Sequence, residues 1–166
     1  MVKGLALGWL GRWAIGLLLF ASVAGAAPIV RAACYNADDM VAKVAESGLA
    51  WERRTENVWR VDLQSRTRGE INVIAVCSDE NVVVFSVLAY AKELQPSQEL
   101  LTLLLRAAAH FDRVKLTIDE DGDYAVRIDV WAQYYNGAVL ASAANQVRAV
   151  IDGMTEALRK FHASKQ

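Results

Sequence analysis

Residues 71–90 read INVIAVCSDENVVVFSVLAY and form the most apolar pair of segments after the N-terminal run. Two aliphatic segments, residues 71–77 and 82–90, flank the polar residues 78–81, an arrangement typical of a β-hairpin. Both segments are apolar on both faces, as the central strands of a sheet are. We therefore predict two neighbouring strands at the centre of a sheet.

A second hairpin follows in residues 114–133, VKLTIDEDGDYAVRIDVWAQ. Apolar and polar residues alternate on both sides of residues 120–123, which predicts two half-buried strands joined by a turn. The alternating aspartates also suggest a calcium loop, but Tyr124 and Val130 stand where such a loop needs glycine and glutamate. Aspartate and glycine suit a tight turn, so we predict a turn here.

Two further strands and three helices complete the pattern. The strands are expected at residues 50–55 and 58–63, and the helices at residues 37–46, 98–110 and 139–161. The middle helix is apolar nearly all round, which predicts burial against the sheet. Apolar residues recur at steps of three or four along the last helix: Leu140, Ala143, Val147, Val150, Met154, Leu158 and Phe161.

These elements predict a single α+β domain over residues 37–163. Their order is α-β-β-β-β-α-β-β-α, which favours an antiparallel sheet with helices on one face.

Residues 1–26 resemble an export signal. Lys3 and Arg12 precede an apolar run, and the small residues Ala-Gly-Ala at positions 24–26 suit a cleavage site. We therefore predict a cleaved signal peptide, an N-terminal arm of residues 27–36, and a periplasmic or secreted domain.

Two other fates of this segment stay open. Residues 13–30 are 18 positions without charge, the lower limit for crossing a bilayer, so the segment can also act as a retained anchor. A lipid anchor at Cys34 is disfavoured by Arg31, where an aliphatic residue is needed. Membrane contact is expected only through an uncleaved signal.

The charge balance excludes one class of partner. The chain has 18 basic and 19 acidic residues, and loss of Lys3 and Arg12 leaves a net charge of −3. A nucleic-acid-binding protein needs a basic surface, so we predict no nucleic-acid partner.

The sequence contains no catalytic motif: it lacks a glycine-rich phosphate loop, a His-x-x-x-His pair and a Gly-x-Ser-x-Gly turn. His110 is expected at the end of the middle helix, where its charge suits the helix dipole. We predict that the protein is not an enzyme and uses no cofactor. The alternative is a ligand-binding or enzymatic domain with a pocket between sheet and helices.

Cys34 and Cys77 are the two cysteines of the chain. In an oxidising compartment they can form a disulfide between the N-terminal arm and the third strand. The other interpretation is that Cys77 is a small buried residue of a strand.

Three aromatic residues close the second hairpin: Trp131, Tyr134 and Tyr135. By strand parity Trp131 shares its face with Arg127 and Asp129, and tryptophan on a polar face often marks a contact surface. We predict that the three aromatics bind a protein partner or a second copy of the chain. Cover by a loop or by the chain's own N-terminus is the alternative.

The stretch of residues 58–161 resembles the YbjN family of bacterial sensory-transduction regulators, whose fold is similar to that of class I type III secretion chaperones. The resemblance rests on the aliphatic pair of strands at residues 71–89, the leucine-rich helix, the Asp-Gly hairpin and the closing helix. It implies a non-enzymatic protein-binding or regulatory module with a chaperone-like fold, often a homodimer. The type members of the family lack export signals, so this chain would be an exported variant.

Overall fold

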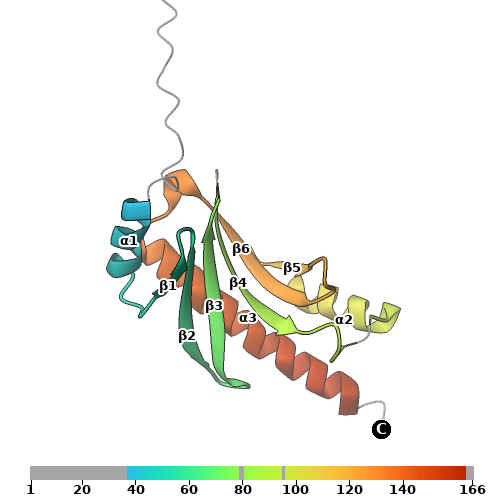
Figure 1. The fold of residues 1–166 in the computed structure, drawn as a ribbon. Coiled ribbons are helices and arrows are strands. Elements are labelled where there is room, and N and C mark those ends of the chain that lie inside the picture. The colour runs from blue at the N-terminus through green and yellow to red at the C-terminus, as the bar shows by residue number, and fades with distance from the viewer. Residues whose placement is uncertain (1–36, 79–80, 95, 164–166) are drawn as a thin grey trace, which may run out of the picture.

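An antiparallel sheet of six strands forms the frame of the molecule (Figure 1). The computed structural model describes residues 37–78, 81–94 and 96–163. The strands are β1 (Glu52–Thr55), β2 (Val58–Ser65), β3 (Gly69–Cys77), β4 (Asn81–Ala89), β5 (Lys115–Ile118) and β6 (Tyr124–Trp131). They lie in the order β1-β2-β3-β4-β6-β5, and every neighbouring pair is antiparallel. The predicted central position of β3 and β4 is confirmed.

The helices lie on one face of this sheet, as predicted. They are α1 (Ala37–Glu46), α2 (Gln98–Ala108) and α3 (Gly137–Ala163), with a short 3-10 helix η2 (Ala132–Tyr134) before α3. The long helix α3 runs across the sheet, and α1 and α2 both pack against α3 (Figure 1). The α+β class and the element order are therefore confirmed.

The core lies between α3 and the sheet. Alternate residues of the central strands point toward α3 and are fully buried, as a period of two requires: Val73, Ala75, Val82 and Val84. The apolar stripe predicted for the last helix faces them, with Leu140, Ala143, Val147, Val150 and Met154 buried. This stripe is therefore core.

The prediction for the middle helix is wrong. Only Leu100 and Leu104 of α2 are buried, whereas Leu105 is 66% exposed. The reason is that α3 already occupies the sheet face, so α2 packs mainly against α3 and the edge strand β5. The helix begins at Gln98 because Ser97 caps it: the Ser97 side chain accepts a hydrogen bond from the Leu100 N–H.

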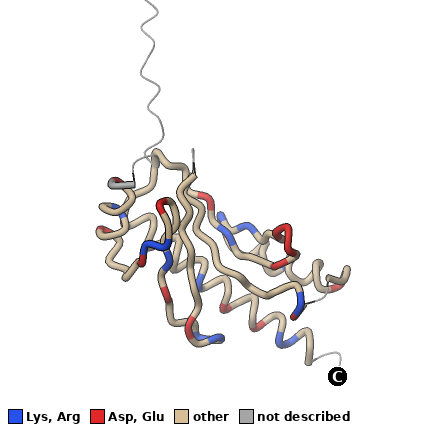
Figure 2. The backbone as a smooth tube through the Cα atoms, viewed as in Figure 1, with Lys and Arg blue, Asp and Glu red and all other residues tan. Residues whose placement is uncertain are grey.

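The other face of the central strands is apolar but has no helix over it within the described ranges. Figure 2 shows that charged residues gather on the outer strands, on the β5–β6 turn and along α3, while β3 and β4 are nearly free of charge. The side chains on this face are partly exposed: Ile74, Val76, Val83, Phe85 and Val87. The sheet thus has one buried face and one open face.

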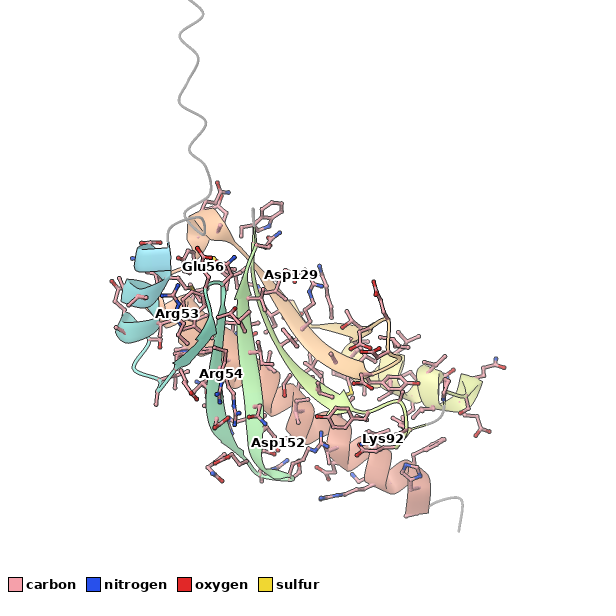
Figure 3. All side chains as sticks on the ribbon, in the orientation of Figure 1. Arg53, Arg54, Glu56, Lys92, Asp129 and Asp152 are labelled. Atoms are coloured by element: carbon pink, nitrogen blue, oxygen red, sulfur yellow. The ribbon has the colours of Figure 1, made fainter. Side chains whose placement is uncertain are left out.

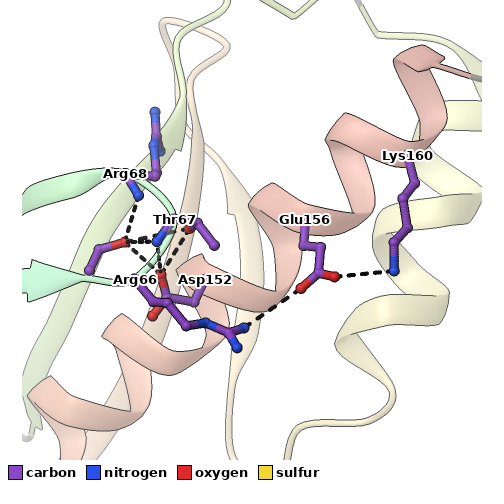
Figure 4. Close-up of polar contacts among 7 residues, drawn as sticks. Arg66, Thr67, Arg68, Asp152, Glu156 and Lys160 are labelled. Atoms are coloured by element: carbon purple, nitrogen blue, oxygen red, sulfur yellow. Dashed lines mark hydrogen bonds and ion pairs between the residues drawn. The ribbon is translucent and has the colours of Figure 1, made fainter.

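A buried carboxylate fastens the β2–β3 turn to α3 (Figure 3, Figure 4). Asp152 Oδ1 accepts hydrogen bonds from the Ser65 hydroxyl at 2.6 Å, the Thr67 hydroxyl at 2.8 Å and the Thr67 N–H at 3.0 Å. Burial alone would raise the pKa of Asp152, but these hydrogen bonds outweigh it and lower the pKa to about 2. The carboxylate therefore stays charged and holds the β2–β3 turn against α3.

The Asp-rich segment between β5 and β6 is a tight turn, as predicted. Asp119 Oδ1 accepts from the N–H groups of Asp121 and Asp123, and Gly122 has a φ of 84°. The Asp123 carboxylate also accepts a hydrogen bond from the Ala91 N–H after β4. These aspartates thus stabilise the turn and its contact with the neighbouring loop.

Several predictions fall on residues outside the described ranges. They are the signal peptide of residues 1–26, the arm of residues 27–36 and the half of the disulfide that Cys34 would supply. No helix within the ranges that are described has both the length and the apolar character needed to cross a membrane.

Candidate functional site

The end of β6 extends beyond its neighbour on the outer side. Strand β5 pairs with β6 only from Ile118, opposite Tyr124, to Lys115, opposite Arg127. Residues 128–131 continue past this point and pair with β4 on the inner side alone. No strand within the described ranges pairs with their outer side. Unpaired N–H and C=O groups on such an edge form a template for another extended chain.

A groove of about 690 Å³ runs along this unpaired edge. Both faces of β6 contribute to its wall, because successive residues of a strand point in opposite directions. The wall is completed by the first turns of α3 and by the segment that enters β5. The lining residues are Asn81, Arg113, Lys115, Ile128, Asp129, Val130, Trp131, Tyr134, Val139, Ser142, Ala143 and Gln146.

Two of the three aromatic residues that were predicted to bind a partner line this groove. Trp131 is 57% exposed and Tyr134 is 67% exposed, and both line the groove. The predicted parity of Trp131 is confirmed, because the strand register places it on the face of Asp129 and Arg127. Large exposed aromatics beside a groove are typical of protein contact surfaces.

Tyr135 differs from its neighbours because it is buried, with 6% of its surface exposed. Its hydroxyl donates a hydrogen bond of 2.8 Å to Asp39 Oδ2 and so ties η2 to α1. Burial, together with this contact to a carboxylate, raises the pKa of Tyr135. Tyr135 therefore supports the fold and does not belong to the exposed surface. The 3-10 turn of η2 ends the strand alternation, which is why strand parity does not place this residue.

The charges at the groove are unevenly paired. Asp129 lies on β6 (Figure 3). It accepts hydrogen bonds from Lys115 Nζ at 2.6 Å and from Arg127 Nε. Burial alone would raise the pKa of Asp129, but the two cations outweigh it and lower the pKa. Arg113 is exposed, has a φ of 63° and makes no hydrogen bond or ion pair with a described residue. The groove wall therefore carries excess positive charge.

Sequence reasoning missed the groove, although a signal for it was present. The alternating pattern runs over five residues before the Asp-rich turn and over about nine after it. Antiparallel strands joined by a tight turn pair residue for residue, so the longer strand must overrun the shorter one. The contribution of α3 to the wall depends on tertiary packing and has no local signal.

Cys77 is the last residue of β3, is 7% exposed and faces the core. Because Cys34 lies outside the described ranges, the predicted disulfide stays a prediction.

No protein-family model matches the chain, and no curated protein matches it. Among solved structures, a chain of the heterodimeric complex ExoU–SpcU from the type III secretion system of Pseudomonas aeruginosa is similar. The two chains are 15% identical with a TM-score of 0.47, over 72% of this chain and 93% of the other. These values are too low to support an inference about function, so the resemblance to the YbjN family also stays a prediction.

Proposed function

We propose that the domain is a non-enzymatic protein-binding module that binds its partner in the groove beside β6. The observation that carries this proposal is the combination of an unpaired strand edge with two exposed aromatics, Trp131 and Tyr134. Aromatic residues lose little conformational entropy on binding and are enriched at the energetic centres of protein interfaces.

The proposal includes the place where the module works. The export-signal pattern of residues 1–26 favours a periplasmic or secreted protein. A regulatory role of the YbjN type is consistent with a binding domain, and it rests on the sequence resemblance alone.

Affinity capture from the envelope fraction tests the binding function. The natively processed protein and its Trp131→Ala and Tyr134→Ala variants serve as baits. Two matched controls remove exposed apolar side chains elsewhere: Tyr90→Ala at a side chain 46% exposed and Leu105→Ala on α2. We expect a protein that the wild type and both controls retain but the groove variants lose. A set of captured proteins that is identical for all five baits would contradict the proposal.

Small-ligand binding is the second candidate, and the groove volume is the observation that favours it. About 690 Å³ lies within the usual range of ligand sites, and Asn81, Ser142 and Gln146 bring polar groups to the wall. The Ser142 hydroxyl accepts a hydrogen bond from the Gln146 amide. A metabolite that raises the melting temperature of the wild type but not of Trp131→Ala, in the absence of any captured protein, would favour this candidate.

A further inference from the structure

The groove wraps around an edge of the sheet, and this shape selects its occupant. Ile128 and Val130 point toward α3, whereas Asp129 and Trp131 point toward the open face, and all four line the groove. A helix lying on either face would contact only one of these pairs. A chain that contacts both pairs has to lie in line with the strand edge itself.

We propose that the occupant is an extended segment of another polypeptide that adds to the sheet as a strand beside residues 128–131 and places a carboxylate at Arg113. This inference rests on the proposed binding function. It adds the mode of binding and the chemistry of the partner segment. Strand addition obtains affinity from main-chain hydrogen bonds and specificity from alternate side chains.

The groove dictates the pattern of that segment. The unpaired stretch of four residues is about 14 Å long, since a strand rises about 3.4 Å per residue. Alternate side chains of an added strand point in opposite directions, one set toward Val130, Val139 and Ala143 and the other set toward Trp131. The first set lies against apolar side chains. We therefore expect an apolar residue at every second position of the partner segment.

The charge of the wall selects a carboxylate. Lys115 and Arg127 share the single carboxylate of Asp129, and Arg113 has no partner in the described part of the chain. Asp112, the residue before Arg113, does not line the groove. The whole chain has a net charge of −1, so this positive wall is a local feature. An aspartate, a glutamate or a C-terminal carboxylate can form a charge-assisted pair with Arg113.

The chain's own N-terminal arm fits this requirement less well than a foreign segment does. Residues 27–36 contain Arg31 and no acidic residue, so the arm would bring a further positive charge to the groove. A second copy that pairs edge to edge would bring to one interface two Arg113 side chains, neither of which has a partner in the described part of its own chain. Both alternatives increase repulsion, whereas an acidic segment removes it.

Synthetic peptides test the mode of binding. The first probe is a fluorescein-labelled heptapeptide of alternating valine and threonine that ends in glutamate. The second peptide ends in an amidated lysine in place of the glutamate. The third peptide has the sequence of the glutamate peptide, but alternate backbone amides are methylated. Fluorescence anisotropy with the natively processed protein measures each dissociation constant. We expect the glutamate peptide to bind at least tenfold more tightly than either of the other two.

Variants of the protein test the role of the arginine. Arg113→Ala should weaken the glutamate peptide about tenfold and leave the lysine peptide unchanged, and Arg113→Glu should reverse the preference between them. Arg106→Ala, an exposed arginine on α2, is the matched control and should change nothing.

Each other outcome overturns the inference. Equal binding of the methylated peptide excludes strand addition, and insensitivity to Arg113→Ala excludes the carboxylate contact. Three further results would show that the occupant is misassigned. In the first the peptide fails to bind up to about 1 mM, and in the second the protein forms dimers that must dissociate before the edge of β6 is exposed. In the third result the peptide binds only after residues 27–36 are removed. In these cases a Trp131-dependent partner in the capture experiment would still leave the proposed function standing, and its absence would remove both.

Discussion

Asp152 is the residue whose charge the fold depends on most visibly. Its pKa is lowered from 3.8 to about 2, so its stabilising effect is present above the ordinary value and disappears as the pH falls toward 2. We expect Asp152→Ala to lower the free energy of unfolding at pH 7 by about 1–3 kcal/mol, because it leaves buried donors without an acceptor. Urea denaturation of both proteins between pH 7 and pH 2 measures the difference.

The difference between wild type and Asp152→Ala should shrink below about pH 4 and nearly vanish at pH 2. Glu156→Gln is the matched control, because Glu156 lies one turn further along α3, its side chain is 49% exposed, and it forms ion pairs with Arg66 and Lys160. Its stability should differ little from that of the wild type, since exposed ion pairs contribute little. A difference for Asp152→Ala that stays constant from pH 7 to pH 2 would contradict the role assigned to the carboxylate.

At the residue scale, the sequence predicted what depends on strand parity and missed what depends on neighbours. The face of Trp131 follows from alternation along β6, and the structure confirms it. The burial of Tyr135 depends on Asp39, which is 96 positions away. That Arg113 has no partner among the described residues depends likewise on where β5 and β6 end. Neither property leaves a pattern in the local sequence.

At the element scale, α1 and α3 approach so closely that only glycine fits between them. A Cβ atom added at Gly137 would lie 2.4 Å from Glu46 Cβ and 2.5 Å from the Glu46 carbonyl carbon. Backbone cannot yield as a side chain can, so Gly137→Ala should destabilise the fold by about 1–3 kcal/mol. Gly153→Ala on the same helix meets only the Phe111 ring at 3.0 Å and should destabilise less. Thermal melting compares them, and equal melting temperatures would refute the close contact.

A second prediction at the element scale concerns the N-terminal arm. We expect Cys34 and Cys77 to form one intramolecular disulfide, which would tie residues 27–36 to the end of β3. The cysteines are 43 positions apart, so closing the loop would stabilise the fold by about 3–4 kcal/mol in the chain-entropy model. Titration of thiols in the unfolded, unreduced protein measures the pairing. Two reactive thiols per chain would exclude the disulfide.

The elements themselves were largely predictable, because their periodicity is strong. Both ends of β4 lie within one residue of the predicted strand, and α3 starts two residues earlier than predicted. The partial exposure of α2 was not predictable from its leucines alone. An apolar helix can be covered on all sides only if the sheet face is vacant, and α3 takes that face. Competition between two helices for one surface is a property of the whole domain.

At the scale of the whole molecule, the predicted export would determine which partners the groove can meet. We expect the mature chain to begin at or near Ala27, because a charged, an apolar and a small-residue segment follow one another in residues 1–26. N-terminal sequencing of the natural protein checks this prediction. Recovery of chains that begin at Met1 from the membrane fraction would instead indicate a retained anchor.

We propose that the groove beside β6 binds a protein, and the Trp131→Ala variant tests this binding. Trp131 is 57% exposed, so its removal should change the free energy of unfolding by less than about 1 kcal/mol. The same change should weaken association with the captured partner by about 2 kcal/mol or more, as loss of a central aromatic anchor does. Tyr90→Ala should change neither quantity much. A loss of stability of about 3–5 kcal/mol with unchanged association would show that Trp131 is a packed residue and that the groove is not the binding site.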